Sequence, residues 1–265
     1  MTRPLRILCF GDSLTAGYSL YGTLYTPYHE SLSRRLTTIF PGLELAIEED
    51  GENGGMTKDY RTRLLAQYRK TGAYDWIIVL GGTNDLAMGV LPEGIFENLE
   101  RTWTLARLKK TKVLALTVPD IANTTVSKAF SRISSCRDHL NELIIGYTAT
   151  NVHSFDFKSA FAYGDMSRDD QRRFWDDAVH LTPAGYDRMG ELVANALAEI
   201  LRKEDDGAAG AQKTTLSTVR PNKRRRMFKD DELSFEEEDG KGTPAQTSGD
   251  ELRRGYVVVR RKDLD

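Results

Sequence analysis

The chain has 265 residues, enough for one large domain or two small ones, and 40% of them are hydrophobic, which suffices for a core. The formal net charge of −2 gives no reason to expect a nucleic acid or a membrane surface as a partner. No apolar run reaches the length of a membrane-spanning helix, so we expect no membrane span.

Three features of the sequence favour a cytoplasmic location. The apolar run near the N-terminus is short, and it ends at Gly11 and Asp12 rather than at the small residues of a signal-peptide cleavage site. The two cysteines, Cys9 and Cys136, are too few for a disulfide framework, which agrees with a reducing compartment. Both are predicted to be small, buried, structural residues.

Strand and helix signals alternate along the first 202 residues. Five short runs rich in branched residues predict strands buried on both faces, namely Leu5–Phe10, Leu43–Glu48, Trp76–Leu80, Val113–Val118 and Val152–Phe157. Helical spacing marks the segments between and after them, namely Pro27–Phe40, Thr57–Lys70, Pro92–Lys110, Val126–Thr148 and Pro183–Arg202. This order predicts an α/β fold of three layers, with a parallel five-stranded sheet between two layers of helices. We expect the sheet to be doubly wound and flavodoxin-like.

From about Lys203 onward the chain loses its large apolar residues and becomes charged. We therefore expect one folded domain over residues 1–202 and a charged, disordered C-terminal tail over residues 203–265. The tail contains a basic block, Lys223–Arg226, whose sequence is compatible with a nuclear import signal or a site for an acidic partner.

A serine follows the first predicted strand at once, in the stretch RILCFGDSLTAGY (Arg6–Tyr18). The carboxyl ends of parallel strands are where such sheets bind ligands, so Ser13 is either the start of a helix or a nucleophile. A serine nucleophile needs a base within hydrogen-bond reach, a group that orients the base, and donors for the oxyanion that it creates. Asp12 is expected to brace its own turn and to take no chemical step.

Candidate oxyanion donors follow the second and third strands. The stretch GGTND (Gly81–Asp85) places Asn84 beside Ser13, because the first and third strands are neighbours in a flavodoxin-like sheet. Its side-chain amide can donate to an oxyanion, whereas Asp85 is expected to make an Asx turn at its strand end. The glycines of GENGGMT (Gly51–Thr57) let backbone N–H groups approach a substrate closely.

The best candidate for the base is His180, in WDDAVHLTP just before the last helix, which Thr182 is expected to cap. Asp177 precedes it by three residues, and in a loop this spacing can bring the carboxylate onto Nδ1 and leave Nε2 free for the serine proton. The other histidines, His29, His139 and His153, lie within predicted helices or at a strand start, where structural roles are expected.

Four stretches together resemble the GDSL, or SGNH, hydrolase family. They are GDSL (Gly11–Leu14), NGGMT (Asn53–Thr57), GTND (Gly82–Asp85) and DAVH (Asp177–His180), and they occur in the family's order and approximate spacing over roughly Arg6–Leu201. The resemblance implies a lipase-like or acylhydrolase-like esterase with Ser13 as nucleophile, His180 as base and then acid, and Asp177 as its orienter. The implied oxyanion donors are the N–H groups of Ser13 and Gly55 and the side-chain amide of Asn84.

One position departs from the family pattern: Met56 stands where an acidic or other polar residue is usual, and Gly54 competes with Gly55 for the donor role. The implied reaction cleaves a carboxylic ester or thioester of a small-molecule substrate through an acyl-serine, and neither a metal nor a cofactor is expected. The sequence does not predict the oligomeric state.

Two alternatives remain open. The first is a carbohydrate O-acetyl esterase of the same fold, and the second is a non-catalytic binding platform on which the tail carries the function. Specificity is expected to come from the loops, and two aromatic segments, Tyr18–Tyr28 and Phe161–Trp175, either wall an acyl or aryl pocket or serve in packing.

Overall fold

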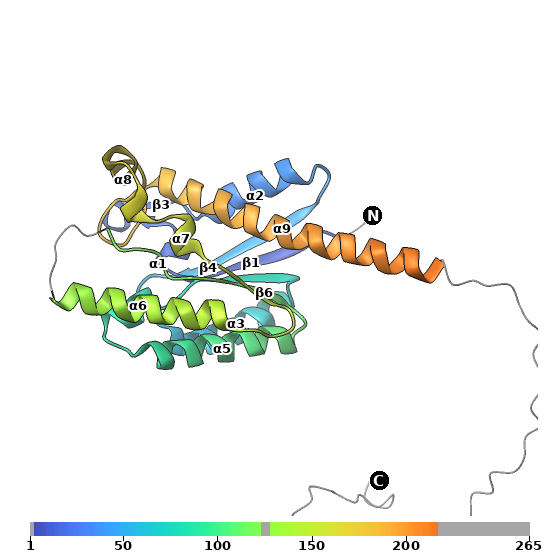
Figure 1. The fold of residues 1–265 in the computed structure, drawn as a ribbon, viewed down its shortest axis with the longest axis horizontal. Helices are drawn as coiled ribbons and strands as arrows, with labels where there is room; N and C mark the ends of the chain where they lie inside the picture. Colours follow the sequence, from blue (N-terminus) through green and yellow to red (C-terminus); the bar gives the residue numbers. More distant parts are fainter. Residues whose placement is uncertain (1–2, 123–127, 217–265) are drawn as a thin grey trace, which may run out of the picture. The chain divides into compact units, whose positions relative to one another are not determined.

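The computed structural model describes residues 3–122 and 128–216 (Figure 1). Five parallel strands form the central sheet in the order β4-β1-β5-β6-β7. Their bounds are β1 Leu5–Asp12, β4 Leu45–Glu52, β5 Trp76–Val79, β6 Lys112–Leu116 and β7 Val152–Phe155. In order along the chain these strands lie 2-1-3-4-5 across the sheet, which confirms the predicted flavodoxin-like topology and the pairing of the first strand with the third.

Helices cover both faces of the sheet, as Figure 1 shows. On one side are α2 (His29–Ile39) and α9 (Pro183–Leu216), and on the other are α3 (Thr57–Thr71), α5 (Pro92–Leu108) and α6 (Lys128–Gly146). Successive side chains of a strand point to opposite faces, so β1 supplies both cores. Ile7 and Cys9 lie in the core beneath α2 and α9, whereas Leu8 and Phe10 lie in the core beneath α3 and α5.

Several predicted elements differ from the structure. The strands β4 and β7 are the edges of the sheet and are only partly buried, because each lacks a neighbour on one side; the prediction of burial on both faces was wrong for them. The last helix does not end at Arg202 but continues to Leu216, through a segment that contains three alanines and four long polar residues alongside two glycines. The basic block Lys223–Arg226 lies outside the described residues.

Several short elements lie at the carboxyl edge of the sheet. Among them are α1 (Ser13–Ala16), a small hairpin of β2 (Tyr18–Ser19), η1 (Leu20–Gly22) and β3 (Leu24–Tyr25), and α4 (Thr83–Ala87). Three more precede α9, namely α7 (Phe157–Ala160), η2 (Tyr163–Asp165) and α8 (Arg168–Phe174). Of the helices in residues 3–122 and 128–216, none is long and apolar enough to cross a bilayer.

Candidate active site

Ser13 opens the one-turn helix α1 at the end of β1. Asp12 caps this helix by accepting the Leu14 N–H on Oδ1 at 3.0 Å, so it braces its own turn as expected. Gly11 is required for the strand to enter the helix here. A Cβ at this position would lie 2.3 Å from Thr15 Oγ1 and 2.4 Å from the Leu80 carbonyl oxygen, both far inside van der Waals contact. The nucleophile turn (Gly11–Ala16) is therefore packed directly against the neighbouring strand.

The Asp12 carboxyl group is fully buried, and its Oδ2 has no hydrogen-bond partner within the described part of the chain. The pKa of Asp12 is raised to about 7, mainly by burial and to a smaller extent by the charge of Asp85. The Leu14 N–H and the Arg63 guanidinium act in the opposite direction. The net effect is that this carboxyl holds its proton to a higher pH than an exposed aspartate does.

The structure brings Ser13, His180 and Asp177 into one hydrogen-bonded chain. Ser13 Oγ lies 3.0 Å from His180 Nε2, and His180 Nδ1 lies 2.9 Å from Asp177 Oδ2. An ionised carboxylate only accepts hydrogen bonds, so Nδ1 must carry the ring proton. Nε2 of the neutral ring then has its lone pair directed at the serine hydroxyl, which is the arrangement of a base poised to accept a proton.

The triad loop (Asp176–Thr182) orients its own carboxylate. Asp177 Oδ1 accepts the N–H groups of Val179 at 2.7 Å and His180 at 2.6 Å. Burial alone would raise the pKa of Asp177, but the hydrogen bonds from His180 and Val179 outweigh it and hold this pKa below its usual value. Asp177 therefore stays ionised beside the imidazole at neutral pH.

Thr182 anchors the end of the triad loop. Its Oγ1 accepts the Gly185 N–H at 3.1 Å, which confirms the predicted cap of the last helix, and its own N–H donates to the Phe174 carbonyl at 2.9 Å. An antiparallel bridge between Trp175 and Leu181 closes the base of the loop.

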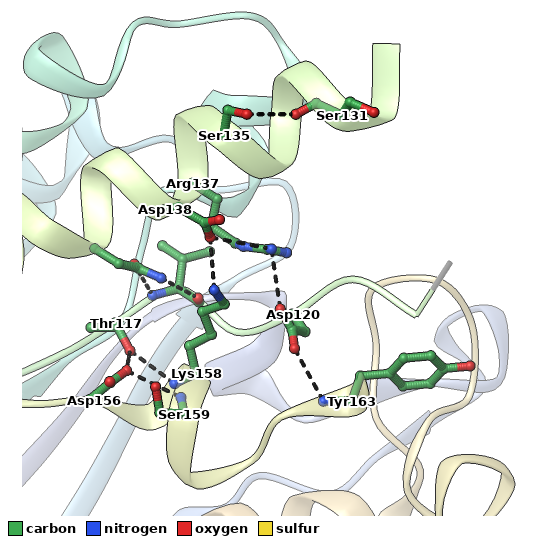
Figure 2. A network of polar contacts seen from close by, with 12 residues as sticks. Thr117, Asp120, Ser131, Ser135, Arg137, Asp138, Asp156, Lys158, Ser159 and Tyr163 are labelled. Atoms are coloured by element: carbon green, nitrogen blue, oxygen red, sulfur yellow. Dashed lines mark hydrogen bonds and ion pairs between the residues drawn. The ribbon is translucent and has the colours of Figure 1, made fainter. Parts of the chain in front are cut away.

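A second loop, residues 117–122 after β6, supports the triad loop from the side. The Ala122 N–H donates to the carbonyl oxygen of Ala178, which lies between Asp177 and His180, at 2.8 Å. Polar contacts hold this second loop, as Figure 2 shows: Arg137 of α6 pairs with Asp120 at 3.1 Å, and Asp120 accepts the Tyr163 N–H at 3.2 Å. Arg137 is buried, so this pair is shielded from solvent.

The polar network of Figure 2 continues to the end of β7. Thr117 Oγ1 donates to Asp156 and accepts the Lys158 N–H, while the Lys158 ammonium pairs with Asp138 at 2.8 Å. The ends of β6 and β7 and the helix α6 are thus tied together beside the site. The sequence analysis missed this network, because its members are ordinary polar and charged residues that lie far apart along the chain.

Asn84 lies at the start of α4, where its side-chain amide donates to the Gly55 carbonyl at 3.0 Å. This bond joins the loops after β4 and β5, the two segments expected to supply oxyanion donors. The Gly55 N–H donates to the Glu52 carbonyl at 2.8 Å within a turn, and Gly54 occupies the left-handed region at φ 72°. An oxyanion at Gly55 would have to share that N–H with the turn.

Asp85 does not form the expected Asx turn at its own strand end. It is buried and accepts the backbone N–H and the hydroxyl of Thr57, the latter at 2.7 Å, so it binds the first turn of α3. The Asx interpretation was wrong because a helix N-terminus lies within reach and offers unpaired N–H groups that a carboxylate satisfies well.

The other histidines lie away from this chain of hydrogen bonds. His139 contacts Glu93 at 3.0 Å on the helical surface, and His153 of β7 lies against Trp76. Burial lowers the pKa of both His29 and His153. Cys9 is buried in the core, as expected, whereas Cys136 is partly exposed, so the prediction of burial was wrong for Cys136; both are free thiols.

The two aromatic segments have different environments. The Tyr18 ring lies 4.5 Å from the His180 ring between centroids, so the first segment borders the site, although Tyr28 at its end is buried in the core. In the second segment Phe161 and Trp175 are buried and stack on each other at 4.7 Å. Those two rings therefore serve in packing.

The chain has recognisable relatives. A family model described as the GDSL-like Lipase/Acylhydrolase family matches residues 9–188. A lipase/acylhydrolase from Enterococcus faecalis superposes with a TM-score of 0.56 at 22% identity, covering 72% of this chain and 94% of that one. An acetylxylan esterase, Axe2 from Geobacillus stearothermophilus, superposes with a TM-score of 0.56 at 18% identity, covering 73% and 92%. Curated protein sequences give no significant match. At these identities the superpositions demonstrate a shared fold.

Proposed function

The chain belongs to the GDSL-like lipase/acylhydrolase family, a family of hydrolases that act on esters, and on that premise we propose that it cleaves carboxylic esters or thioesters through an acyl-serine at Ser13. The observation that carries the proposal is the continuous hydrogen-bonded chain Ser13–His180–Asp177. It supplies the three groups that serine hydrolysis needs in contact.

The proposed reaction has two halves. Ser13 Oγ attacks the acyl carbon while its proton passes to His180 Nε2, and the imidazolium that forms is stabilised by ionised Asp177. His180 then gives this proton to the departing alcohol or thiol, which leaves the acyl group on Ser13. In the second half a water gives its proton to His180 and attacks the acyl carbon, and the serine leaves with that proton.

The negative charge that develops on the acyl oxygen needs donors. We assign these to the Ser13 N–H and the Asn84 side-chain amide, with the Gly55 N–H as a third that must be shared with the Glu52 carbonyl. An amide carries two hydrogens, so Asn84 can hold the Gly55 carbonyl with one and present the other to substrate.

Labelling with a fluorophosphonate, which reacts with activated serines, tests the nucleophile. The parent protein is expected to label, and Ser13→Ala and His180→Ala to lose both the label and the hydrolysis of p-nitrophenyl esters. The matched controls are Ser135→Ala and His139→Ala, both exposed on α6, which should behave as the parent. Undiminished labelling of Ser13→Ala would contradict the assignment and favour the binding-platform alternative.

The carbohydrate O-acetyl esterase remains the second candidate within the same chemistry. This candidate is supported by the fold that the chain shares with a protein described as an acetylxylan esterase. Activity against acetylated xylan compared with simple esters of longer acyl chains separates the two candidates, because a deacetylase is restricted to the acetyl group.

A further inference from the structure

A short hairpin, Tyr18–Tyr25, lies directly on the triad loop. The Tyr18 ring faces the His180 ring at 4.5 Å, and the Leu20 N–H donates to Asp176, the neighbour of Asp177, at 2.6 Å. The Tyr186 hydroxyl of α9 holds the Tyr18 carbonyl at 2.7 Å. The hairpin is therefore attached both to the loop that carries the base and to the helix that follows it.

The surface of this hairpin is unusually apolar. Eight large hydrophobic side chains are exposed in the described part of the chain, and four of them belong to this hairpin. They are Leu20 (50% exposed), Tyr21 (92%), Leu24 (37%) and Tyr25 (48%), and the eight residues of the hairpin include no charged side chain. A cluster of exposed apolar groups beside a reactive serine is typical of a ligand-binding surface.

The backbone of the tip is strained. Leu20 and Tyr21 are consecutive residues in the left-handed region, with φ of 48° and 54°, although neither is a glycine. Local bonds hold this conformation: the N–H and hydroxyl of Thr23 both donate to the Leu20 carbonyl. Strain of this kind persists where the surroundings impose it and clusters at functional sites. Here it keeps two large apolar side chains at the surface beside the triad.

The far strand of the hairpin reaches the oxyanion side of the site. The Tyr25 hydroxyl accepts the Asn53 side-chain amide at 2.6 Å, and Asn53 lies two residues before Gly55, which binds Asn84. The Tyr18 and Tyr25 rings pack edge to face at 5.9 Å. The hairpin thus forms one wall from the imidazole to the loop after β4.

We propose that the tip of the hairpin, Leu20 and Tyr21, together with Tyr25 on the face that it shares with Tyr18, binds an apolar leaving group, so that the substrate is the ester of a bulky apolar or aromatic alcohol. The inference rests on the proposed function and on the place of the imidazole in it. Since His180 must protonate the departing oxygen, groups that border its ring border the alcohol part of the ester. The exposed side chains of the tip include a leucine and no charged group, which favours an apolar alcohol.

The test compares three substrates in the full-length protein: 2-naphthyl acetate, ethyl acetate and ethyl hexanoate, the last below its micellar concentration. In the double variant Leu20→Ala/Tyr21→Ala we expect kcat/KM for 2-naphthyl acetate to fall at least about tenfold, mainly through KM. The values for both ethyl esters should change less than about twofold. For each substrate, the kcat/KM of the variant is divided by that of the parent, so that the higher intrinsic reactivity of the naphthyl ester cancels.

The control is Leu108→Ala/Ile145→Ala, which removes two other exposed apolar side chains. Both precede strands, at the ends of α5 and α6, and therefore lie at the amino edge of the sheet, opposite the site. The inference would be overturned if the hairpin variant kept the parental kcat/KM for 2-naphthyl acetate. It would also be overturned if kcat/KM fell equally for all three esters. A loss confined to ethyl hexanoate would overturn it in favour of an acyl-chain subsite.

Failure of this inference is separable from failure of the proposed function. If Ser13→Ala retains parental hydrolysis of 2-naphthyl acetate, the mechanism itself is wrong and the subsite assignment is overturned with it. If hydrolysis depends on Ser13 but is indifferent to Leu20 and Tyr21, only the leaving-group subsite is wrong.

Discussion

The two halves of the candidate site are built in different ways. The nucleophile turn, Gly11–Ala16, is buried and backed by β5, and steric contacts leave it one conformation. The triad loop, Asp176–Thr182, is mostly only partly buried, and hydrogen bonds to its own backbone and to a second loop hold it. An atom added to a close-packed turn creates a steric clash that displaces the backbone. Loss of one contact in a polar network leaves the other hydrogen bonds in place, so the loop is displaced less. The halves should therefore respond differently to mutation.

The largest effect is expected in the nucleophile turn. Gly11→Ala puts a methyl group within 2.4 Å of the Leu80 carbonyl oxygen and within 2.3 Å of Thr15 Oγ1. Relief requires the turn to move, which should lower kcat/KM by more than about 100-fold, since a misplacement of 1 Å has that effect. Destabilisation by about 1–3 kcal/mol should accompany it in denaturant titrations. Activity equal to the parent's would contradict the steric account.

The second largest effect on activity is expected for substitution of Asn84. Asn84→Ala removes one oxyanion donor and is expected to lower kcat by about 10²–10³-fold with a smaller change in KM, because the donor acts on charge that develops in the transition state. Steady-state kinetics on a p-nitrophenyl ester measure this. A kcat within a factor of two of the parent's would remove Asn84 from the mechanism.

The supporting loop should give a graded effect. Arg137→Met/Asp120→Asn removes a buried ion pair without leaving either charge alone, and should release the loop whose Ala122 N–H holds the Ala178 carbonyl. We expect kcat to fall about tenfold with KM nearly unchanged. The matched control is Lys112→Met/Glu204→Gln, which removes a pair at the amino edge of the sheet. Equal losses in both double variants would mean that the network has no special link to the triad loop.

Among these substitutions, Asp12→Asn should change turnover least. Its main effect should be on how the free energy of unfolding depends on pH. A folded-state pKa of about 7 lies above the unfolded value near 4, so the folded state binds this proton more tightly. Its contribution to stability is greatest below about pH 4 and is lost as the pH rises towards 7. Asp12→Asn, which keeps an acceptor for the Leu14 N–H, should remove that decline.

The measurement for Asp12 is the free energy of unfolding of parent and variant at several pH values between 4 and 7. The stability difference, variant minus parent, should grow with pH across this range. A difference that stays constant would show that burial does not perturb this carboxyl.

Much of the site could be predicted because it lies where strands end. Ser13 and Asn84 follow strands that a flavodoxin-like order makes neighbours, and the spacing of Asp177 and His180 suits a loop that folds back on itself. All segments that follow parallel strands lie at the carboxyl edge of the sheet, because the strands run in the same direction. Local patterns therefore predict the parallel sheet, and the flavodoxin-like strand order predicts which segments are neighbours.

What could not be predicted depends on tertiary partners. Asp85 binds the first turn of α3 instead of its own turn, and Arg137 pairs with Asp120 across a loop and a helix. Neither residue pair has a fixed spacing that marks it in a sequence. The left-handed Leu20 and Tyr21 carry no glycine signal either, and propensity alone argues against their conformation.

The central claim is that Ser13 carries the acyl group during turnover. The most direct measurement is peptide mass spectrometry of protein quenched in acid during hydrolysis of p-nitrophenyl acetate. The account predicts a single acetyl group on the peptide that contains Ser13, and none there in Ser13→Ala. Steady hydrolysis with the adduct on another residue, at a level and rate that Ser13→Ala leaves unchanged, would contradict it.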